Sequence, residues 1–202
     1  MIALLLVRHA PTAWNRAGRV HGRVDVELAD AGVARARGWR LPAGFDDARV
    51  VASPLKRACQ TAAILAAGRE VTIEPRLTEM DWGAWEGLTL ASARAADPDG
   101  AARNEARGLD FRPPGGESPR EVTVRLAGFL RDLATDRRAA IAVTHKGILR
   151  AALFLATGWD MRAKPPIRLG VGDALRLDVA PSGAPSHPRL LPLDGTPARL
   201  PA

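Results

Sequence analysis

The chain has 202 residues, 47% hydrophobic and 25% charged, as expected for one globular domain with a substantial core. Its single cysteine, Cys59, excludes an internal disulfide and any cysteine-based metal cluster, and we expect it to be a small buried thiol in a helix. The net charge is +7, carried almost entirely by arginines that are scattered along the chain, which favours a small anionic substrate over nucleic acid.

The first expected element is a buried strand over residues 2–7 that ends abruptly at Arg8 and His9. Such a strand presents a cation and an imidazole at one edge of a sheet, and open α/β sheets bind ligands at the carboxyl ends of their strands. We interpret His9 as a nucleophile that attacks phosphorus, with Arg8 holding phosphoryl oxygens and Asn15 donating an amide hydrogen. On this stretch alone, a strand that ends in two solvated residues is the alternative.

A loop marked by two glycines follows. It contains His21, which we interpret as an exposed or loop-stabilising histidine, and two arginines, Arg19 and Arg23, that are candidates to reach the phosphate. Asp30 is then expected to cap a helix over residues 31–40.

Residues 49–52 are the second expected strand, and Ser53 and Pro54 after it predict the N-cap and first position of a helix. Arg57 falls in the first turns of that helix beside a strand end, where a cation and a helix start suit an anion. A solvated helix face is the alternative for this arginine. A further strand is expected at 70–74.

Residues 80–117 are expected to leave the core and cover a site as a lid. Just before them, Glu79 is the candidate acid that protonates a leaving oxygen. Burial beside Met80 and Trp82 would raise the pKa of its carboxyl and keep it protonated. The arginines of this segment either meet an acidic substrate or face solvent: Arg94, Arg103, Arg107 and Arg112.

The second half of the chain repeats the pattern of its beginning. Ser118 and Glu121 form a capping-box sequence at the start of a long amphipathic helix. A buried strand over 139–144 then runs directly into His145, and a helix is expected at 148–157.

Strands that alternate with helices predict an α/β fold. We expect one three-layer domain with a mainly parallel central sheet and helices on both faces. Residues 1–180 form the expected catalytic domain, which includes a last core strand at 173–179. Residues 181–202 are expected to supply an edge strand at 190–193 or a loose tail.

The ends of the core strands are expected to meet at one crevice, which brings together His9, Arg8, Arg57 and His145. Phosphoryl transfer requires groups that stabilise the negative charge on the equatorial oxygens. Two guanidinium groups and a second imidazole can do this. The sequence shows no carboxylate cluster that suggests a metal. We therefore expect a site without metal or cofactor.

Several motifs occur in a fixed order across residues 4–150. They are Arg8-His9 through Asn15, Ser53 through Thr61, Leu77-Thr78-Glu79 followed by Gly83 through Gly87, Gly116-Glu117-Ser118, and Val143-Thr144-His145. Together they resemble the histidine phosphatase superfamily, in its phosphoglycerate mutase-like branch. The resemblance implies the fold of that branch and a phosphohistidine at His9. It also implies Glu79 as acid and then base, and a phosphate pocket formed by Arg8, Asn15, Arg57 and His145.

Two positions depart from the family pattern. Ala10 replaces the glycine after the first histidine, so a positive φ at this residue would be strained. Lys146 replaces the glycine after the second histidine. Its backbone N–H can still serve the site, and its ammonium group is a candidate substrate contact.

The function that follows is a metal-independent phosphatase acting on a small phosphorylated metabolite, without nucleic acid or a membrane as partner. A cofactor-dependent phosphoglycerate mutase is the alternative within the same chemistry, although family mutases are typically longer. A non-catalytic protein that binds phosphate or nucleic acid is the more distant alternative. No segment reaches the about 20 apolar residues of a membrane span and the N-terminal run does not resemble a signal peptide, so a cytoplasmic location is expected.

Overall fold

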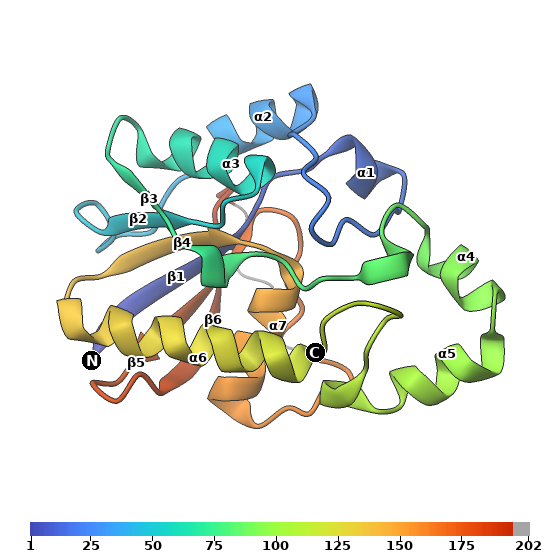
Figure 1. Cartoon of the computed structure of the whole chain (residues 1–202). Coiled ribbons are helices and arrows are strands. Elements are labelled where there is room, and N and C mark those ends of the chain that lie inside the picture. The colour runs from blue at the N-terminus through green and yellow to red at the C-terminus, as the bar shows by residue number, and fades with distance from the viewer. Residues whose placement is uncertain (196–202) are drawn as a thin grey trace.

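The computed structural model describes residues 1–195, which contain a six-stranded sheet in the order β3-β2-β4-β1-β5-β6 (Figure 1). The strands are β1 (Ile2–Arg8), β2 (Arg49–Ala52), β3 (Val71–Ile73), β4 (Ala140–Thr144), β5 (Asp173–Val179) and β6 (Pro185–Pro192). Neighbours among β3, β2, β4 and β1 are parallel, whereas β5 and β6 are antiparallel. The expectation of a mainly parallel sheet is confirmed.

Helices cover both faces of this sheet, with α2 and α3 on one side and α6 and α7 on the other (Figure 1). The short helices α4 and α5 lie apart from the sheet, at the right of the view. The α-helices are α1 (Ala13–Arg16), α2 (Asp30–Arg37), α3 (Lys56–Ala66), α4 (Leu90–Ala95), α5 (Pro98–Glu105), α6 (Pro119–Asp136) and α7 (Lys146–Thr157). Three 3₁₀ turns are η1 (Pro75–Leu77), η2 (Gly83–Trp85) and η3 (Gly108–Asp110).

The alternation of side chains along β1 divides the core into two halves. Leu4 and Leu6 pack in the cluster that includes the buried faces of α6 and α7, and Leu5 and Val7 pack in the cluster that includes α3. All four side chains are fully buried. Since burial of each contributes roughly 1.5–3 kcal/mol, the strand is fixed on both faces and its end is held rigidly.

One of the expected helix starts is confirmed and one is wrong. Ser118 accepts a hydrogen bond from the backbone of Glu121, whose carboxylate bonds back to Ser118 N–H, so the capping box of α6 is present. In contrast, α3 begins at Lys56 after Leu55, which forms no side-chain cap. The hydroxyl of Ser53 is instead hydrogen-bonded to His145, a contact that helix-start rules do not consider.

Other boundaries shift by a few residues. Asp30 is the first residue of α2, and Ala29 precedes it without a side-chain cap. The helix after the second histidine starts at Lys146 rather than 148, and β6 begins before the expected 190–193 because it pairs with β5 along most of its length. Cys59 is half-buried rather than buried, and its thiol donates to a backbone carbonyl. The expected tail residues 196–202 lie outside the described residues.

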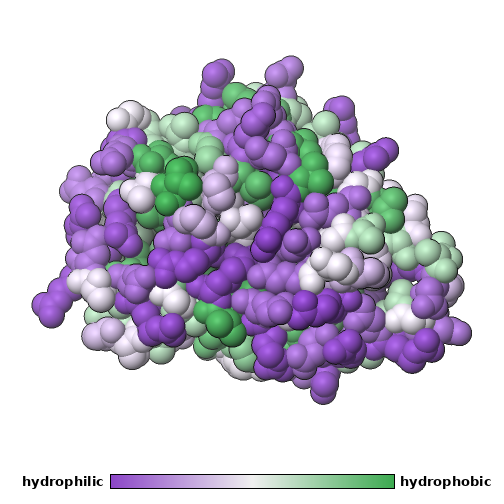
Figure 2. Space-filling view, viewed as in Figure 1, coloured by the Kyte–Doolittle hydropathy of each residue, from purple (hydrophilic) through white to green (hydrophobic). Residues whose placement is uncertain are grey.

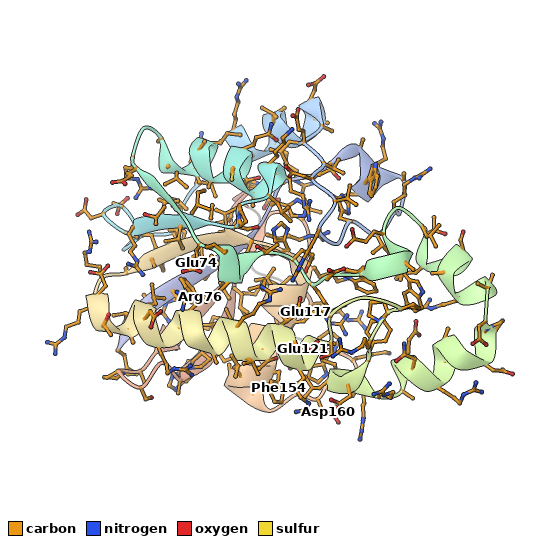
Figure 3. All side chains as sticks on the ribbon, viewed as in Figure 1. Glu74, Arg76, Glu117, Glu121, Phe154 and Asp160 are labelled. Carbon is orange, nitrogen blue, oxygen red and sulfur yellow. The ribbon has the colours of Figure 1, made fainter. Side chains whose placement is uncertain are left out.

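Residues 80–117 extend from the core at an aromatic cluster. The rings of Trp82, Trp85 and Phe111 lie with centroids 5.5–6.2 Å apart. Nearby, η1 is fastened to α6 because Arg76 binds both Glu74 and a carboxylate of that helix; Glu74 and Arg76 are labelled in Figure 3.

The surface is mixed in character. Figure 2 shows hydrophilic residues over most of one face, with apolar residues in separate patches. None of the described helices has the length and apolar composition that crossing a membrane requires.

Candidate active site

Three adjacent strands deliver the first residues of the site to one edge of the sheet. The N–H of His9 donates to Thr144 O at 2.9 Å, and the N–H of Ser53 donates to Val143 O at 3.0 Å. Because β2, β4 and β1 are parallel neighbours, the residues that follow their ends, Ser53, His145 and His9, come together.

His9 is held as a neutral imidazole. Its Nδ1 lies 2.8 Å from Ala10 O, and since a carbonyl only accepts, Nδ1 carries the proton and Nε2 keeps its lone pair. The residue is only 5% exposed. Burial first, and then the positive charges of Arg8 and Arg57, hold the pKa of His9 well below its usual value. A neutral, oriented Nε2 is the form that a nucleophile requires.

His145 lies beside it, with ring centroids 5.2 Å apart. Its Nε2 is 2.7 Å from the hydroxyl of Ser53, which also accepts a 3.4 Å bond from the N–H of Leu55. When the Ser53 hydroxyl donates to Nε2, the neutral ring carries its proton on Nδ1. That Nδ1 is buried and has no hydrogen-bond partner among the described residues.

Arg57 is fully buried and joins the site to a neighbouring loop. Its two terminal nitrogens donate to Val24 O and Gly22 O, each at 2.8 Å. Its Nε, like His145 Nδ1, is buried and has no partner in the described part of the chain. Buried hydrogen-bond donors are normally satisfied. The Nε of Arg57 and the Nδ1 of His145 are therefore suited to donate to an oxygen of a bound anion.

Glu79 is anchored by the backbone around the second histidine. Its Oε1 accepts from the N–H groups of Met80 at 2.8 Å and Gly147 at 3.0 Å. Burial raises the pKa of Glu79, against the opposing effect of these hydrogen bonds and of Arg57 and Arg8. The shift favours the protonated carboxyl that a general acid needs.

A cleft of about 590 Å³ opens over these groups. Five of the seven residues predicted for the site line it: Arg8, His9, Asn15, Glu79 and Lys146. The other two, Arg57 and His145, are fully buried. The side-chain oxygen of Asn15 accepts from the N–H and hydroxyl of Thr12, which leaves its NH₂ group to donate.

The model of the histidine phosphatase superfamily (branch 1) matches residues 4–185. The chain belongs to this superfamily. The expected resemblance is therefore confirmed, and the two histidines, two arginines and one carboxyl described above lie within the matched region.

Known members of the superfamily resemble the chain over most of its length. Phosphoserine phosphatase 1 of Hydrogenobacter thermophilus is 32% identical over 168 residues, covering 80% of this chain and 79% of that protein. A 2,3-bisphosphoglycerate-dependent phosphoglycerate mutase of Methylobacterium radiotolerans is 33% identical, covering 84% and 85%. The solved structure of mycobacterial glucosyl-3-phosphoglycerate phosphatase with VO3 superposes with a TM-score of 0.77 at 26% identity, covering 97% of this chain and 100% of that one.

One histidine of the site was not predicted. His21 is buried rather than exposed, but its Nε2 lies 2.6 Å from the Thr12 hydroxyl, so the expected loop-stabilising role is present. Its ring centroid is 5.9 Å from that of His9. Burial and the charges of Arg57 and Arg8 lower the pKa of His21 to about 4, so this ring too is neutral. Three of the four histidines of the chain thus gather in one place.

The structure has room for Ala10 and Lys146, the two residues that depart from the family pattern. Ala10 is absent from the described residues with positive φ, and its N–H donates to the Thr61 hydroxyl at 3.0 Å, so the strain considered for this position does not arise. Lys146 is the first residue of α7 and lines the cleft. Desolvation and the charges of Arg8 and Arg150 lower the pKa of Lys146.

The remaining candidate arginines divide between cleft and surface. Arg19 lines the cleft, whereas Arg23 reaches Asp81 and Glu117, the latter labelled at the start of α6 in Figure 3. Arg94 also lines the cleft but is paired with Glu105. Farther out, Arg112 is paired with a carboxylate of α6, and the last two arginines are exposed, namely Arg103 and Arg107.

The close approach of α7 to Glu79 gives a first prediction. A Cβ at Gly147 would lie 2.3 Å from Glu79 Oε1, so Gly147→Ala must displace the carboxyl. We expect kcat to fall by about 10²-fold, the order of loss that follows a misplacement of about 1 Å, with little change in melting temperature. Gly128→Ala, also within a helix but with no neighbour closer than 3.7 Å to its new Cβ, is the matched control. Equal activity of the two variants would contradict the role given to this contact.

Proposed function

We propose that the protein is a metal-independent phosphomonoesterase that hydrolyses a small phosphorylated metabolite through a phosphohistidine at His9. The observation that carries the proposal is the neutral His9 ring in the cleft, 5.2 Å from His145, with buried unpartnered donors beside it. The phosphatases among the superfamily members support the reaction class. We place the reaction in the cytoplasm, because a chain with one cysteine cannot form the internal disulfides common in secreted proteins.

In the first step, His9 Nε2 attacks phosphorus as the bond to the ester oxygen breaks. Glu79 gives its proton to that oxygen, so an alcohol leaves and the carboxyl becomes a carboxylate. The equatorial oxygens carry the negative charge of the transition state. We assign four groups to hold them: Arg8, Asn15, Arg57 and His145.

In the second step, the phosphoryl group is transferred from nitrogen to water. The Glu79 carboxylate takes a proton from the attacking water, and the bond between His9 Nε2 and phosphorus breaks. Inorganic phosphate leaves, and both His9 and the Glu79 carboxyl return to their starting protonation states.

A phosphoglycerate mutase is the second candidate, favoured by the similarity to the Methylobacterium radiotolerans mutase. Incubation with 3-phosphoglycerate and a 2,3-bisphosphoglycerate primer separates the two. We expect phosphate release to exceed formation of the 2-phosphate isomer at all times. Isomer formation that outpaces phosphate release would establish the mutase instead.

Treatment with a chelator gives a further prediction. Arg8, Arg57 and the imidazoles can supply the positive field that many phosphoryl-transfer enzymes take from magnesium. The described residues contain no group of three histidine, cysteine or carboxylate side chains that could hold a metal ion. We therefore expect excess EDTA to change the rate of phosphate release by less than about 10%. Loss of most activity, restored by added Mg²⁺ or Zn²⁺, would contradict this expectation.

A further inference from the structure

A second cleft of about 300 Å³ lies next to the first and shares three cations with it, Arg8, Lys146 and Arg150. It is formed by one side of α7 and by residues 165–169. Phe154 and Asp160, labelled in Figure 3, mark the last turn of α7 and the start of the connection to that segment. The apolar part of its lining consists of Leu149, Leu153, Pro165, Ile167 and Leu169.

The charge of this second cleft is one-sided. Arg168 adds a fourth cation to the lining, and none of the described residues that line it is acidic. Within residues 1–195, none of the four cations forms an ion pair. The carboxyl of Glu79 is the acidic group that attracts three of them, Arg8, Lys146 and Arg150, and it carries no charge when it is protonated. The mutual repulsion of the four cations is then relieved when an anion enters.

Arg150 is the best-placed of these cations. It lies four residues after Lys146 on α7, so the two side chains are neighbours on one face of the helix. Its guanidinium carbon stands 5.3 Å from the ring centroid of Trp159, which orients the group. Its Nε is buried and has no hydrogen-bond partner among the described residues. A buried donor of this kind fits an acceptor that arrives with a ligand.

Arg8 connects the two clefts. It is the last residue of β1, directly before His9, and lines both openings; in the proposed mechanism it holds the phosphoryl group that His9 attacks. A leaving group that extends from the reacting phosphorus past Arg8 therefore reaches Lys146 and Arg150, with the apolar residues of α7 beneath it.

We propose that the second cleft binds a second anionic group, a carboxylate or a phosphate, carried on the leaving group of the substrate, through Lys146 and Arg150. This inference rests on the proposed phosphatase function and narrows it to doubly anionic substrates with a short apolar connection between the two groups. Lys146 stands where the family pattern has a glycine, so its ammonium group is a contact that the pattern itself does not supply.

Three synthetic phosphate esters on one three-carbon skeleton test the proposal. They are propane-1,3-diol monophosphate, propane-1,3-diol bisphosphate and 3-(phosphonooxy)propanoate, whose leaving groups carry no charge, a phosphate and a carboxylate respectively. We expect wild-type kcat/KM to be at least about tenfold higher for one or both of the anionic esters than for the monophosphate, mainly through KM. The better of the two identifies the chemistry of the second anion.

The variants are Arg150→Met and Lys146→Met, which remove one charge each and keep an apolar stem. Each is expected to reduce the preference for the anionic ester by about 10- to 100-fold. Arg138→Met, on an exposed arginine paired with Asp136, is the control and should keep the wild-type preference. Melting temperatures check the fold, and the exposed Lys146 provides a second test if Arg150→Met is unstable.

The outcomes distinguish failure of the second anion site from failure of the proposed phosphatase function. Equal kcat/KM for all three esters in the wild type, or a preference retained in both variants, overturns the second anion site while leaving the phosphatase intact. Failure to hydrolyse any ester, with no phosphohistidine formed, overturns the proposed function and the anion site with it.

Discussion

His9→Ala is expected to abolish turnover, with a fall in kcat of about 10⁴-fold or more. The substitution removes the nitrogen that forms the covalent intermediate, and no other imidazole takes its place. His145 is fully buried and bonded to Ser53, and His21 is bonded to the Thr12 hydroxyl. Loss of a nucleophile that acts as part of a unit costs most of the chemical acceleration. Release of inorganic phosphate from an alkyl phosphate measures the effect.

The control is His187→Ala, which removes an exposed histidine of β6 that is paired with Asp178. This variant should hydrolyse the ester at the wild-type rate. Brief incubation with ³²P-labelled substrate should also place acid-labile label on His9 in the wild type and none in His9→Ala. Label on another residue would refute the nucleophile assignment. Absence of label and turnover, together with tight salt-dependent RNA binding, would favour the non-catalytic alternative.

Glu79→Gln is expected to lower kcat/KM, which reports the step that forms the phosphohistidine, by about 10²- to 10⁴-fold for alkyl phosphates and much less for p-nitrophenyl phosphate. An alkoxide leaves only with a proton, whereas nitrophenolate is a stable anion that needs none. The amide keeps the size of the side chain and can still accept from Gly147. Glu70→Gln, on an exposed carboxylate, is the matched control. Equal losses for both classes of ester would remove Glu79 from the role of acid.

The same variant has a pH signature. The reaction needs His9 neutral, at pH values above its lowered pKa, and Glu79 protonated, at pH values below its raised pKa. For an alkyl phosphate, kcat/KM should therefore decline as pH rises through the pKa of Glu79. In Glu79→Gln this alkaline decline should be absent, because the amide does not titrate. An unchanged decline in the variant would show that another group controls it.

The strands and the positions of the two histidines at their ends could be predicted because their signals are local. Apolar runs long enough for one strand end at His9 and at His145, and parallel neighbours must bring such ends to one edge. The helix expected to start at Ser53 was predicted by an equally local rule. There the rule failed, since the Ser53 hydroxyl bonds to a histidine 92 residues away instead of to its own helix.

The rest of the site depends on the path of loops, which composition and periodicity do not encode. His21 was predicted to be exposed or loop-stabilising; it does bond to Thr12, but nothing in the sequence indicated that its loop also brings the ring to within 5.9 Å of that of His9. The second cleft likewise combines Lys146 and Arg150 of α7 with a segment that has no regular structure. Only the three-dimensional arrangement shows that these cations share one opening.

Arg57 donates to the carbonyls of Gly22 and Val24, so the rigidity of this loop and the binding of the phosphoryl oxygens depend on the same side chain. One planar group braces the loop beside the nucleophile and also keeps its buried Nε without a partner among the described residues. A lysine at this position would keep the charge, but its compact ammonium group could not reach both carbonyls and a bound anion at once. A substitution of Arg57 should therefore weaken phosphate binding and increase the mobility of the loop at Gly22 and Val24 at the same time.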